Sequence, residues 1–397
     1  MTPRALTACA AIAVCVAASA QETPKSATAS ACLAPATWYS LAGGKPRALA
    51  QAEILNDAVG REVVLLGESH NDFDHHQWQL QTLASLYLLR PRMVIGFEAF
   101  PRRVQPVLDQ WVAGNLTQRQ FLERVEWEKI WNVPAALYLP LFQFARLNRI
   151  PMAALNVDKK LTEEINKKGW DGVPAEQKEG VSRPAPATRA YEEYLFEVYK
   201  QHVHDKGSAA PNRSDAGFRR FGESQTTWDR AMAEALARHL KGERESRPLV
   251  VGIMGSGHVR NGYGVAHQLR DLGVTGIAAL LPLEAETPCS DIKTALADAV
   301  FALPVAPREK PAPPRLGVQL EMRDKNVAIA AVTPSSLAEQ SGIRAGDVVV
   351  SVAGAPVSSM ASVTAAVREQ PAGTWLPIQV RRGESTIDLV IKFPPKT

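Results

Sequence analysis

The sequence predicts two folded units, an α/β domain with an open, mostly parallel sheet and flanking helices, followed by a small, mostly β module. Apolar runs of strand length alternate with segments of helical periodicity, and this alternation predicts the first unit. A proline-rich stretch at residues 304–314 then precedes short β patterns with turn signals, which predict the second. The length of 397 residues also favours two domains.

The composition restricts the class of protein. With 46% hydrophobic and 22% charged residues, the chain has the composition of a globular protein. A net charge of +4 is small for this length, and basic residues do not alternate with aromatic residues. We therefore expect no nucleic-acid partner.

Residues 1–20 are organised like a secretory signal. Arg4 gives a positive start, a short apolar stretch follows, and Ala18-Ser19-Ala20 is a small-x-small cleavage site. Lipidation at Cys9 is the alternative, but its recognition sequence precedes most of the apolar stretch. We expect an exported protein, in the periplasm or associated with the outer membrane, with a flexible lead-in at residues 21–36.

Removal of the signal would leave two cysteines, Cys32 and Cys289. In an exported protein such a pair can form one disulfide that ties the N-terminal segment to the end of the first domain. Zinc ligation by the isolated pair is the less favoured alternative.

The first strand of the predicted sheet carries polar residues at its carboxyl end. The apolar run 63–66 stops at Gly67, and Glu68 and His70 follow directly. In an open parallel sheet, ligands bind beyond the carboxyl ends of the strands. His75 and His76 begin the next helix, and we expect one to face the pocket and the other to face water.

The remaining elements of this domain follow in order. A second strand at 93–97 ends in Glu98, and the connection between the two strands should be a right-handed crossover. A charged region at about 157–241 interrupts the alternation and predicts a helical insertion or lid over the carboxyl edge. The other predictions are helices at 46–59, 78–89, 104–112, 117–125, 136–147, 189–203, 224–240 and 263–272, and strands at 151–156, 249–254 and 276–281.

Two histidines share one local pattern, Gly67 to His70 and Gly255 to His258. Each follows an apolar run, so we expect both to face one pocket, where they could bind a metal or haem iron or act as acid and base. Helix capping or loop hydrogen bonding is the plain alternative, and the repeated pattern favours a site. Glu98 could complete a metal site with them, and Glu68 or Glu98 could serve as a catalytic base.

Two tyrosines are candidate ligands for haem iron, because a deprotonated tyrosine suits ferric iron. They are Tyr138, in the helix after Trp131, and Tyr263, five residues beyond His258. Ordinary packing is the alternative for both. In the second unit, Arg315-Leu316-Gly317-Val318 predicts a loop whose N–H groups bind a terminal carboxylate, against the alternative of a simple glycine turn.

The second unit resembles a known peptide-binding family. Residues 335–358 are similar to a PDZ domain of the bacterial protease-associated kind, with Gly342, Gly346 and Gly354 at its turns. The loop at 315–318 matches that family's carboxylate-binding loop, with Arg315 in place of the usual aromatic residue. The resemblance implies a PDZ domain at 313–397, after a linker at 291–312, that binds a peptide or a partner's C-terminus.

The first unit, predicted at 37–290, carries a set of motifs: Leu66-Gly67-Glu68-Ser69-His70, Gly96-Phe97-Glu98, Tyr138, Pro140, Phe144-Ala145-Arg146, Gln225, Trp228-Asp229, Met232-Ala233 and Gly255-Ser256-Gly257-His258. With these motifs, residues 40–283 resemble a known family, the ChaN-like haem-binding group of the Tiki superfamily. The resemblance implies haem or iron binding in uptake, a tyrosine ligand to iron and a membrane-associated partner. The wider superfamily includes metal-dependent peptidases, so a hydrolase with a divalent metal such as zinc or manganese is the alternative.

Overall fold

The computed structural model describes residues 32–43, 45–131, 133–204, 212–304 and 314–395. They form two compact units, one ending at Val305 and one beginning at Ala306. The predicted signal at 1–20 and most of the predicted lead-in lie outside the described residues. Among the helices that are described, none is both long enough and apolar enough to cross a membrane.

The first unit contains an eight-stranded sheet in the order β2-β1-β8-β7-β3-β6-β4-β5. The six strands from β8 to β5 pair in parallel, and β1 adds to β8 and to β2 in antiparallel fashion. The predicted fold class, an α/β domain with an open, mostly parallel sheet, is therefore confirmed. The strands are β1 (Thr37–Ser40), β2 (Arg47–Leu49), β3 (Val63–Glu68), β4 (Met93–Pro101), β5 (Met152–Asn156), β6 (Leu249–Gly255), β7 (Ile277–Glu284) and β8 (Ala299–Leu303).

Helices cover both faces of this sheet, because successive side chains of a buried strand point to opposite faces. Val64 and Leu66 of β3 belong to one apolar core, together with residues of α2 and α6. Val63 and Leu65 belong to a second core, together with residues of α9 and α11. The helices outside the insertion are α1 (Gln51–Val59), α2 (Phe73–Leu89), α3 (Gln105–Val112), α4 (Gln118–Arg124), α5 (Trp127–Ile130), α6 (Ala135–Leu147), α10 (Ser256–Val259) and α11 (Val265–Asp271).

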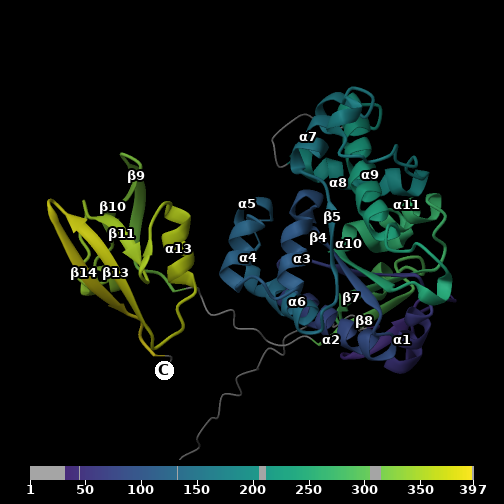
Figure 1. Cartoon of the computed structure of the whole chain (residues 1–397), viewed down its shortest axis with the longest axis horizontal. Helices are drawn as coiled ribbons and strands as arrows, with labels where there is room; N and C mark the ends of the chain where they lie inside the picture. The colour runs from purple at the N-terminus through teal and green to yellow at the C-terminus, as the bar shows by residue number, and fades with distance from the viewer. Residues whose placement is uncertain (1–31, 44, 132, 205–211, 305–313, 396–397) are drawn as a thin grey trace, which may run out of the picture. The chain divides into compact units, whose positions relative to one another are not determined.

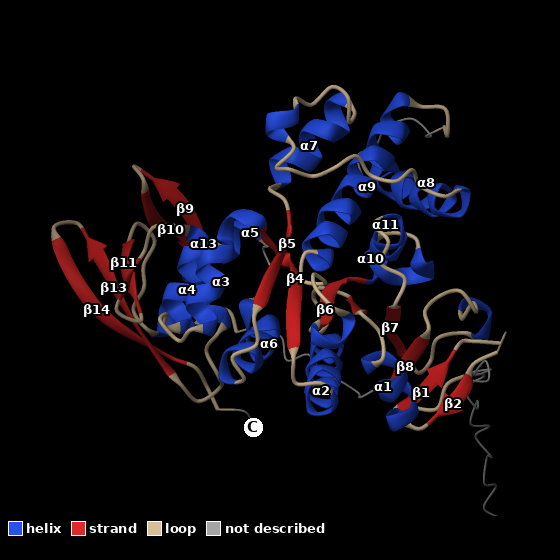
Figure 2. Cartoon of the chain, turned by 45° about the vertical axis from the view of Figure 1, so that its right-hand side comes forward, coloured by secondary structure: helices blue, strands red, loops and turns tan. Residues whose placement is uncertain are grey.

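The predicted insertion is helical and lies at one end of the unit, where Figures 1 and 2 both show its helices together. It contains α7 (Lys159–Lys168), α8 (Arg189–His204) and α9 (Ala216–Ala237). α9 begins eight residues before the predicted helix at 224–240. Met232 and Leu236 of α9 are fully buried in the same core as Leu155 of β5. The insertion is thus anchored in the domain core and is more than a cover over it.

The sheet continues into the range 291–312, which the sequence predicts as a linker. β8 lies within this range and pairs with β7 and β1. Its five residues, Ala-Val-Phe-Ala-Leu, form an apolar run too short to stand out beside the prolines that follow. Cys32, just before β1, forms a disulfide with Cys289, so the start of the unit is tied to the segment between β7 and β8.

Gly67 occupies a site with no room for a side chain. A Cβ at this position would lie 2.2 Å from Leu281 Cδ2 and 2.9 Å from Ser256 Oγ. We expect Gly67→Ala to lower the free energy of unfolding by about 1 to 3 kcal/mol, because overpacking forces neighbours out of their rotamers. Denaturant unfolding measures this. Gly222→Ala is the control, since a Cβ at Gly222 meets nothing within 4 Å, and an equal effect of both changes would contradict the prediction.

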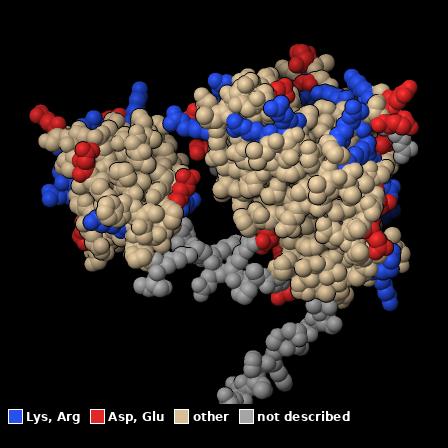
Figure 3. All heavy atoms as spheres, turned by 60° about the horizontal axis from the view of Figure 1, so that its bottom comes forward, with Lys and Arg blue, Asp and Glu red and all other residues tan. Residues whose placement is uncertain are grey.

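One region of the first unit carries few charges. Between them, α2 and α6 contain only Asp74 and Arg146 as charged residues. Leu88 and Leu147, near the ends of these helices, are 81% and 80% exposed. In Figure 1, α2 and α6 lie in the lower part of the first unit. Figure 3 brings that lower side toward the viewer and shows a wide area of the unit with neither basic nor acidic side chains.

The second unit has the predicted, mostly β, architecture. Its antiparallel sheet has the order β14-β13-β11-β10-β9, with β12 paired to β11. Val327, Val380 and Ile391 are among the residues of its apolar core, against which Val363 of α13 packs. The elements are β9 (Val318–Arg323), β10 (Asn326–Val332), β11 (Val348–Val352), β12 (Ala355–Pro356), β13 (Trp375–Arg382), β14 (Ser385–Lys392), α12 (Leu337–Gln340) and α13 (Met360–Arg368).

Candidate functional site

Three adjacent strands bring the predicted site residues to one edge of the sheet. β6 lies between β3 and β4, and Glu68 of β3 is in register with Gly255 of β6. Phe97 of β4 is in register with Ile253, so Glu98 follows close to the level of Gly255. The glycine thus lies between the two glutamates, at the carboxyl edge where the sequence predicts the site.

His70 forms a pair with the buried carboxylate of Glu68. Its Nδ1 lies 2.8 Å from Glu68 Oε1. Burial alone would raise the pKa of Glu68, but the hydrogen bond with His70 and the nearby His76 outweigh it and hold that pKa below its usual value. Burial would likewise lower the pKa of His70, but Glu68 and Glu98 raise it. The pair therefore fixes the His70 ring with Nδ1 turned inward.

His258 forms a second pair of the same kind. Its Nδ1 lies 2.7 Å from Asp229 Oδ1, and the hydroxyl of Tyr191 donates to Asp229 Oδ2 at 2.7 Å. Burial would lower the pKa of His258, but the carboxylates of Glu98 and Asp229 outweigh it and raise the pKa to about 9. This chain of contacts leaves Nε2 of His258 facing away from Asp229.

Glu98 lies between the two histidines. Its Oε2 accepts a hydrogen bond from the Gly255 N–H at 2.6 Å, and its Oε1 lies 3.6 Å from His258 Nε2. A Cβ on Gly255 would lie 3.1 Å from His70 Nε2 and 3.6 Å from Glu98 Oε2. The structure therefore brings His70, Glu98 and His258 together around Gly255, with both Nε2 atoms on the side of Glu98.

Several buried polar atoms around this point make no hydrogen bond with a described residue, although Glu68 Oε2 lies 3.4 Å from His76 Nδ1 and Glu98 Oε1 lies 3.6 Å from His258 Nε2. Glu68 Oε2, Glu98 Oε1 and the indole nitrogens of Trp131 and Trp228 make no hydrogen bond there. The Trp131 ring lies 4.7 Å from the His70 ring, and the Trp228 ring lies 4.9 Å from the His258 ring. Because buried polar groups are normally satisfied, this concentration of open acceptors and donors fits a site that receives a ligand.

The donor set also fits a metal ion. A histidine whose Nδ1–H faces a carboxylate presents its Nε2 lone pair to a metal, and such carboxylates orient metal-binding histidines in many proteins. Two histidines with one carboxylate and open positions suit iron, and His₂Glu sets also bind zinc. His70, His258 and Glu98 are the residues that would hold it.

The two candidate tyrosines have different surroundings. The hydroxyl of Tyr138 donates to Glu68 Oε1, and burial together with that carboxylate raises the pKa of Tyr138 far above its ordinary value. A phenolate ligand is therefore strongly disfavoured at Tyr138. Tyr263 is only half-buried, and its ring lies 5.6 Å from that of Tyr191, the partner of Asp229. Tyr263 therefore lies beside the chain of contacts that holds His258, whereas Tyr138 contacts the pair of Glu68 and His70.

His75 and His76 are both buried, so the expectation that one of them faces water is wrong. His76 Nε2 lies 3.0 Å from the backbone oxygen of His70, and its Nδ1 lies 3.4 Å from Glu68 Oε2. The Ser69 N–H donates to His75 Nδ1 at 2.8 Å. Both histidines therefore support the turn that carries His70 and do not line open space.

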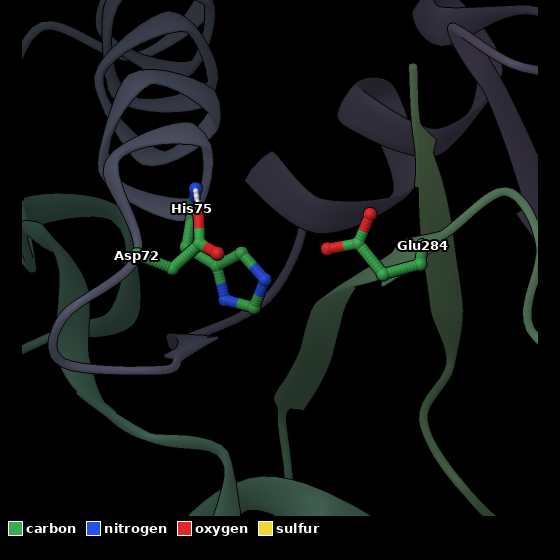
Figure 4. Close-up of side chains that lie close together, drawn as sticks. All are labelled: Asp72, His75 and Glu284. Carbon is green, nitrogen blue, oxygen red and sulfur yellow. Dashed lines mark hydrogen bonds between the residues drawn. The ribbon is translucent and has the colours of Figure 1, made fainter. Parts of the chain in front are cut away.

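A second group of potential ligands is formed by Asp72, His75 and Glu284, whose ligand atoms lie within 4.8 Å of one another (Figure 4). Neutral imidazole has one lone pair, and the Ser69 N–H occupies the one on Nδ1. His75 Nε2 must then carry the proton, so it cannot bind a metal while this bond holds. Asp72 is also engaged, because its Oδ1 accepts from two N–H groups at the start of α2.

Sequence reasoning gave no site role to Asp229 and Tyr191. Asp229 lies in the middle of α9 and Tyr191 near the start of α8, both within the insertion. A single acidic or aromatic residue in a charged helical region has no local pattern that marks it. The only signal was that Asp229 belongs to the motifs that carry the family resemblance.

Gly255 determines how close His70 approaches Glu98. We expect Gly255→Ala to weaken ligand binding at this site about tenfold, because the new methyl group would lie 3.0 Å from His70 Cε1 and displace the ring. A haem titration measures this. Gly257→Ala is the matched control, since its methyl group would make an ordinary 3.5 Å contact with Tyr194. Equal affinities of the two variants would contradict the prediction.

The loop at 315–318, which the sequence predicts to bind a carboxylate, leads into β9. Gly317 has a φ of +80°, and a Cβ there would lie 2.3 Å from Ser336 Cβ, so only glycine fits. The carbonyls of Leu316 and Gly317 accept hydrogen bonds from Ala338 and Thr333. Within the described part of the chain, the N–H groups of Leu316 and Gly317 donate to no protein atom. They remain available to an anion.

Comparison with known proteins gives two family matches. A family of haem-binding uptake proteins, described as Tiki superfamily, ChaN, matches residues 54–269. The PDZ domain family matches residues 314–393. No curated protein matches the sequence significantly.

Among solved structures, the chain is similar to ChaN of Campylobacter jejuni with cofacial haem, at 16% identity and a TM-score of 0.52. This match covers 66% of this chain and 95% of that chain. The HtrA3 PDZ domain with a phage-derived ligand is 23% identical over 20% of this chain and 82% of that chain, with a TM-score of 0.18. A serine endoprotease from Yersinia pestis is 24% identical over 21% of this chain and 29% of that chain, with a TM-score of 0.19.

The first family match covers more than half of the sequence, and the fold of the first unit agrees with the Campylobacter structure. The second match covers nearly all of the described part of the second unit. The chain therefore belongs to the ChaN family of the Tiki superfamily and carries a C-terminal PDZ domain.

Proposed function

We propose that the first unit binds haem, or iron, at the sheet edge formed by Glu68, His70, Glu98 and His258, and that the protein serves haem or iron uptake after export. The family supports haem binding. The observation that carries the assignment to this edge is the approach of two carboxylate-held histidines to Glu98. A bound iron would supply coordination positions for nitrogen and oxygen donors.

In this proposal, the residues around the sheet edge have different roles in binding the ligand. Glu68 and Asp229 hold the two imidazole rings so that each Nε2 faces the ligand. Tyr263, beside Tyr191, is the candidate tyrosine ligand. His70 has a side chain 36% exposed, and its ring packs edge-on against Trp131, so this histidine is the one that a ligand could reach from solvent.

The experiment is a haem titration of the purified mature chain, followed by the Soret band. Wild-type protein should shift the band, and His70→Ala or Tyr263→Phe should abolish or strongly weaken the shift. Tyr87→Phe is the control, because Tyr87 packs against Phe144 in another part of the unit. A full shift in all variants would overturn the assignment to this edge.

A metal-dependent hydrolase is the second candidate, and the position of Glu98 favours it. Its Oε1 has no hydrogen-bond partner among the described residues and lies 3.6 Å from His258 Nε2, so this carboxylate could take a proton from water. Zinc or manganese held by His70 and His258 would lower the pKa of that water when bound. Metal-stimulated peptide cleavage that Glu98→Gln abolishes, with no haem spectrum, would establish this function instead.

The PDZ domain would bring in a partner through that partner's C-terminus, and a membrane-associated partner suits an uptake role. The free N–H groups of Leu316 and Gly317 support carboxylate binding. Arg315 is exposed beside them and would add a positive charge. Removal of residues 313–397 should abolish partner capture and leave the haem titration unchanged, and the reverse result would count against this division of roles.

A further inference from the structure

The helical insertion contains a cavity of about 480 Å³ between α8, α9 and the loop before α8. This volume lies in the range of small-molecule sites. Its walls are largely apolar, and Trp170 and Leu195 are themselves buried. Further apolar lining comes from Pro184, Ala185, Pro186 and Phe218.

Three arginines and two glutamates line this cavity, the glutamates being Glu192 and Glu223. Arg183 is paired with Asp171, and the guanidinium of Arg213 lies 4.9 Å from the centre of the Phe196 ring. Arg219 makes no ion pair or side-chain hydrogen bond with any residue that the structure describes. Arg213 likewise has no ion pair with a described residue, but its guanidinium lies against the Phe196 ring, so Arg219 is the arginine of this lining with neither kind of contact there.

Arg219 lies where the cavity meets a second, more open hollow of about 240 Å³. Trp170 and Glu223 also line both spaces. The second hollow is further lined by Lys168, Arg220 and Asp171, so basic residues outnumber acidic ones there by one. Glu223 is already engaged, since it accepts from the Trp170 N–H at 2.8 Å. A largely apolar space thus adjoins a charged one, with Arg219 lining both.

This cavity is separate from the sheet-edge site. None of its lining residues belongs to the two histidine pairs or to Glu98. On α9, Thr226 and Thr227 line the cavity, whereas Asp229 holds His258 at the sheet edge. The two sites therefore use different residues of the same helix.

We propose that this cavity binds an amphipathic anion, with an apolar body in the larger space and a carboxylate or sulfonate at Arg219. The size and apolar walls of the cavity suit the apolar part of the ligand, and the unpaired guanidinium of Arg219 suits its negatively charged group. A medium-length alkyl carboxylate and a small aromatic sulfonate share this chemistry. The proposal does not depend on what the sheet edge binds.

The test is a fluorescence titration of the full chain with 8-anilinonaphthalene-1-sulfonate. Gly222 lines the cavity, and a Cβ there meets nothing within 4 Å, so Gly222→Leu should fill the space without a clash. Gly222→Ala is the matched control, because both changes favour the helix but alanine leaves the cavity open. We expect dye binding to fall at least tenfold in Gly222→Leu and to stay unchanged in Gly222→Ala.

The negative group is tested at Arg219. Arg219→Ala should weaken dye binding about tenfold, the usual scale for losing a charge-assisted contact. Arg189→Ala is the control, since the Arg189 side chain is 93% exposed and outside the cavity. Octanoate should displace the dye and octanol should not. Unchanged binding in Gly222→Leu and Arg219→Ala, or equal displacement by octanol, would overturn the proposal.

Discussion

Replacing His258 with alanine is expected to lower haem affinity by about 100-fold or more. The imidazole is buried, and its Nε2 faces Glu98, so no neighbouring group can take its place. Losing a held nitrogen ligand removes both a bond to iron and the preorganised pocket around it. The measurement is the Soret titration of variant and wild-type protein, at constant pH.

Two further variants test whether this loss of haem affinity depends on how His258 is held. Asp229→Asn keeps the shape of the side chain but weakens its hold on His258 Nδ1, and we expect a loss of about 10- to 100-fold. His239→Ala should have no effect, because His239 lies beyond the end of α9 and away from the pair. Wild-type affinity in His258→Ala would place the haem elsewhere on the molecule.

The stability of the ligand-free protein should fall as the pH rises from about 6.5 to 9. The pKa of His258 is raised in the folded state to about 9, from an ordinary value of 6.5. The folded protein therefore holds this proton more tightly than the unfolded chain does. The resulting stabilisation is complete below pH 6.5 and is lost as the pH rises through 9. Its size is on the order of 3 kcal/mol.

Denaturant unfolding at a series of pH values measures this effect, with haem and metal ions removed because they compete with the proton. His258→Gln should show a smaller decrease over the same range, because glutamine has no proton to lose. The difference between the two proteins isolates His258 from other groups, including His70, whose pKa is also raised. Identical pH profiles would contradict the prediction.

The sheet edge could be predicted because its signals are local. A buried strand in a parallel sheet is a short apolar run, and the glycine that ends it is visible in the sequence at Gly67 and Gly255. The rule that parallel strands share a carboxyl edge then places His70 and His258 together. Packing also requires glycine at Gly67 and Gly255, because a Cβ at either position would lie 3.0 Å or less from a neighbouring side chain.

The partners of these histidines could not be predicted in the same way. Asp229 reaches His258 only because α9 crosses the sheet and buries Met232 and Leu236 against β5, which is a matter of tertiary packing. The role of Tyr138 likewise depends on its distance to Glu68, 70 positions earlier in the chain. The short edge strands β1 and β2 have too few residues for a periodic signal.

The disulfide between Cys32 and Cys289 makes the redox state of a preparation matter. It joins positions 257 residues apart and holds the segment before β1 to the segment between β7 and β8. A thiol reductant in the buffer would break this disulfide, and β1 would then be free to separate from β8. The exposed edge of β8 would then present unpaired backbone N–H and C=O groups to other molecules. Reduced samples should therefore aggregate on storage, whereas oxidised samples should not.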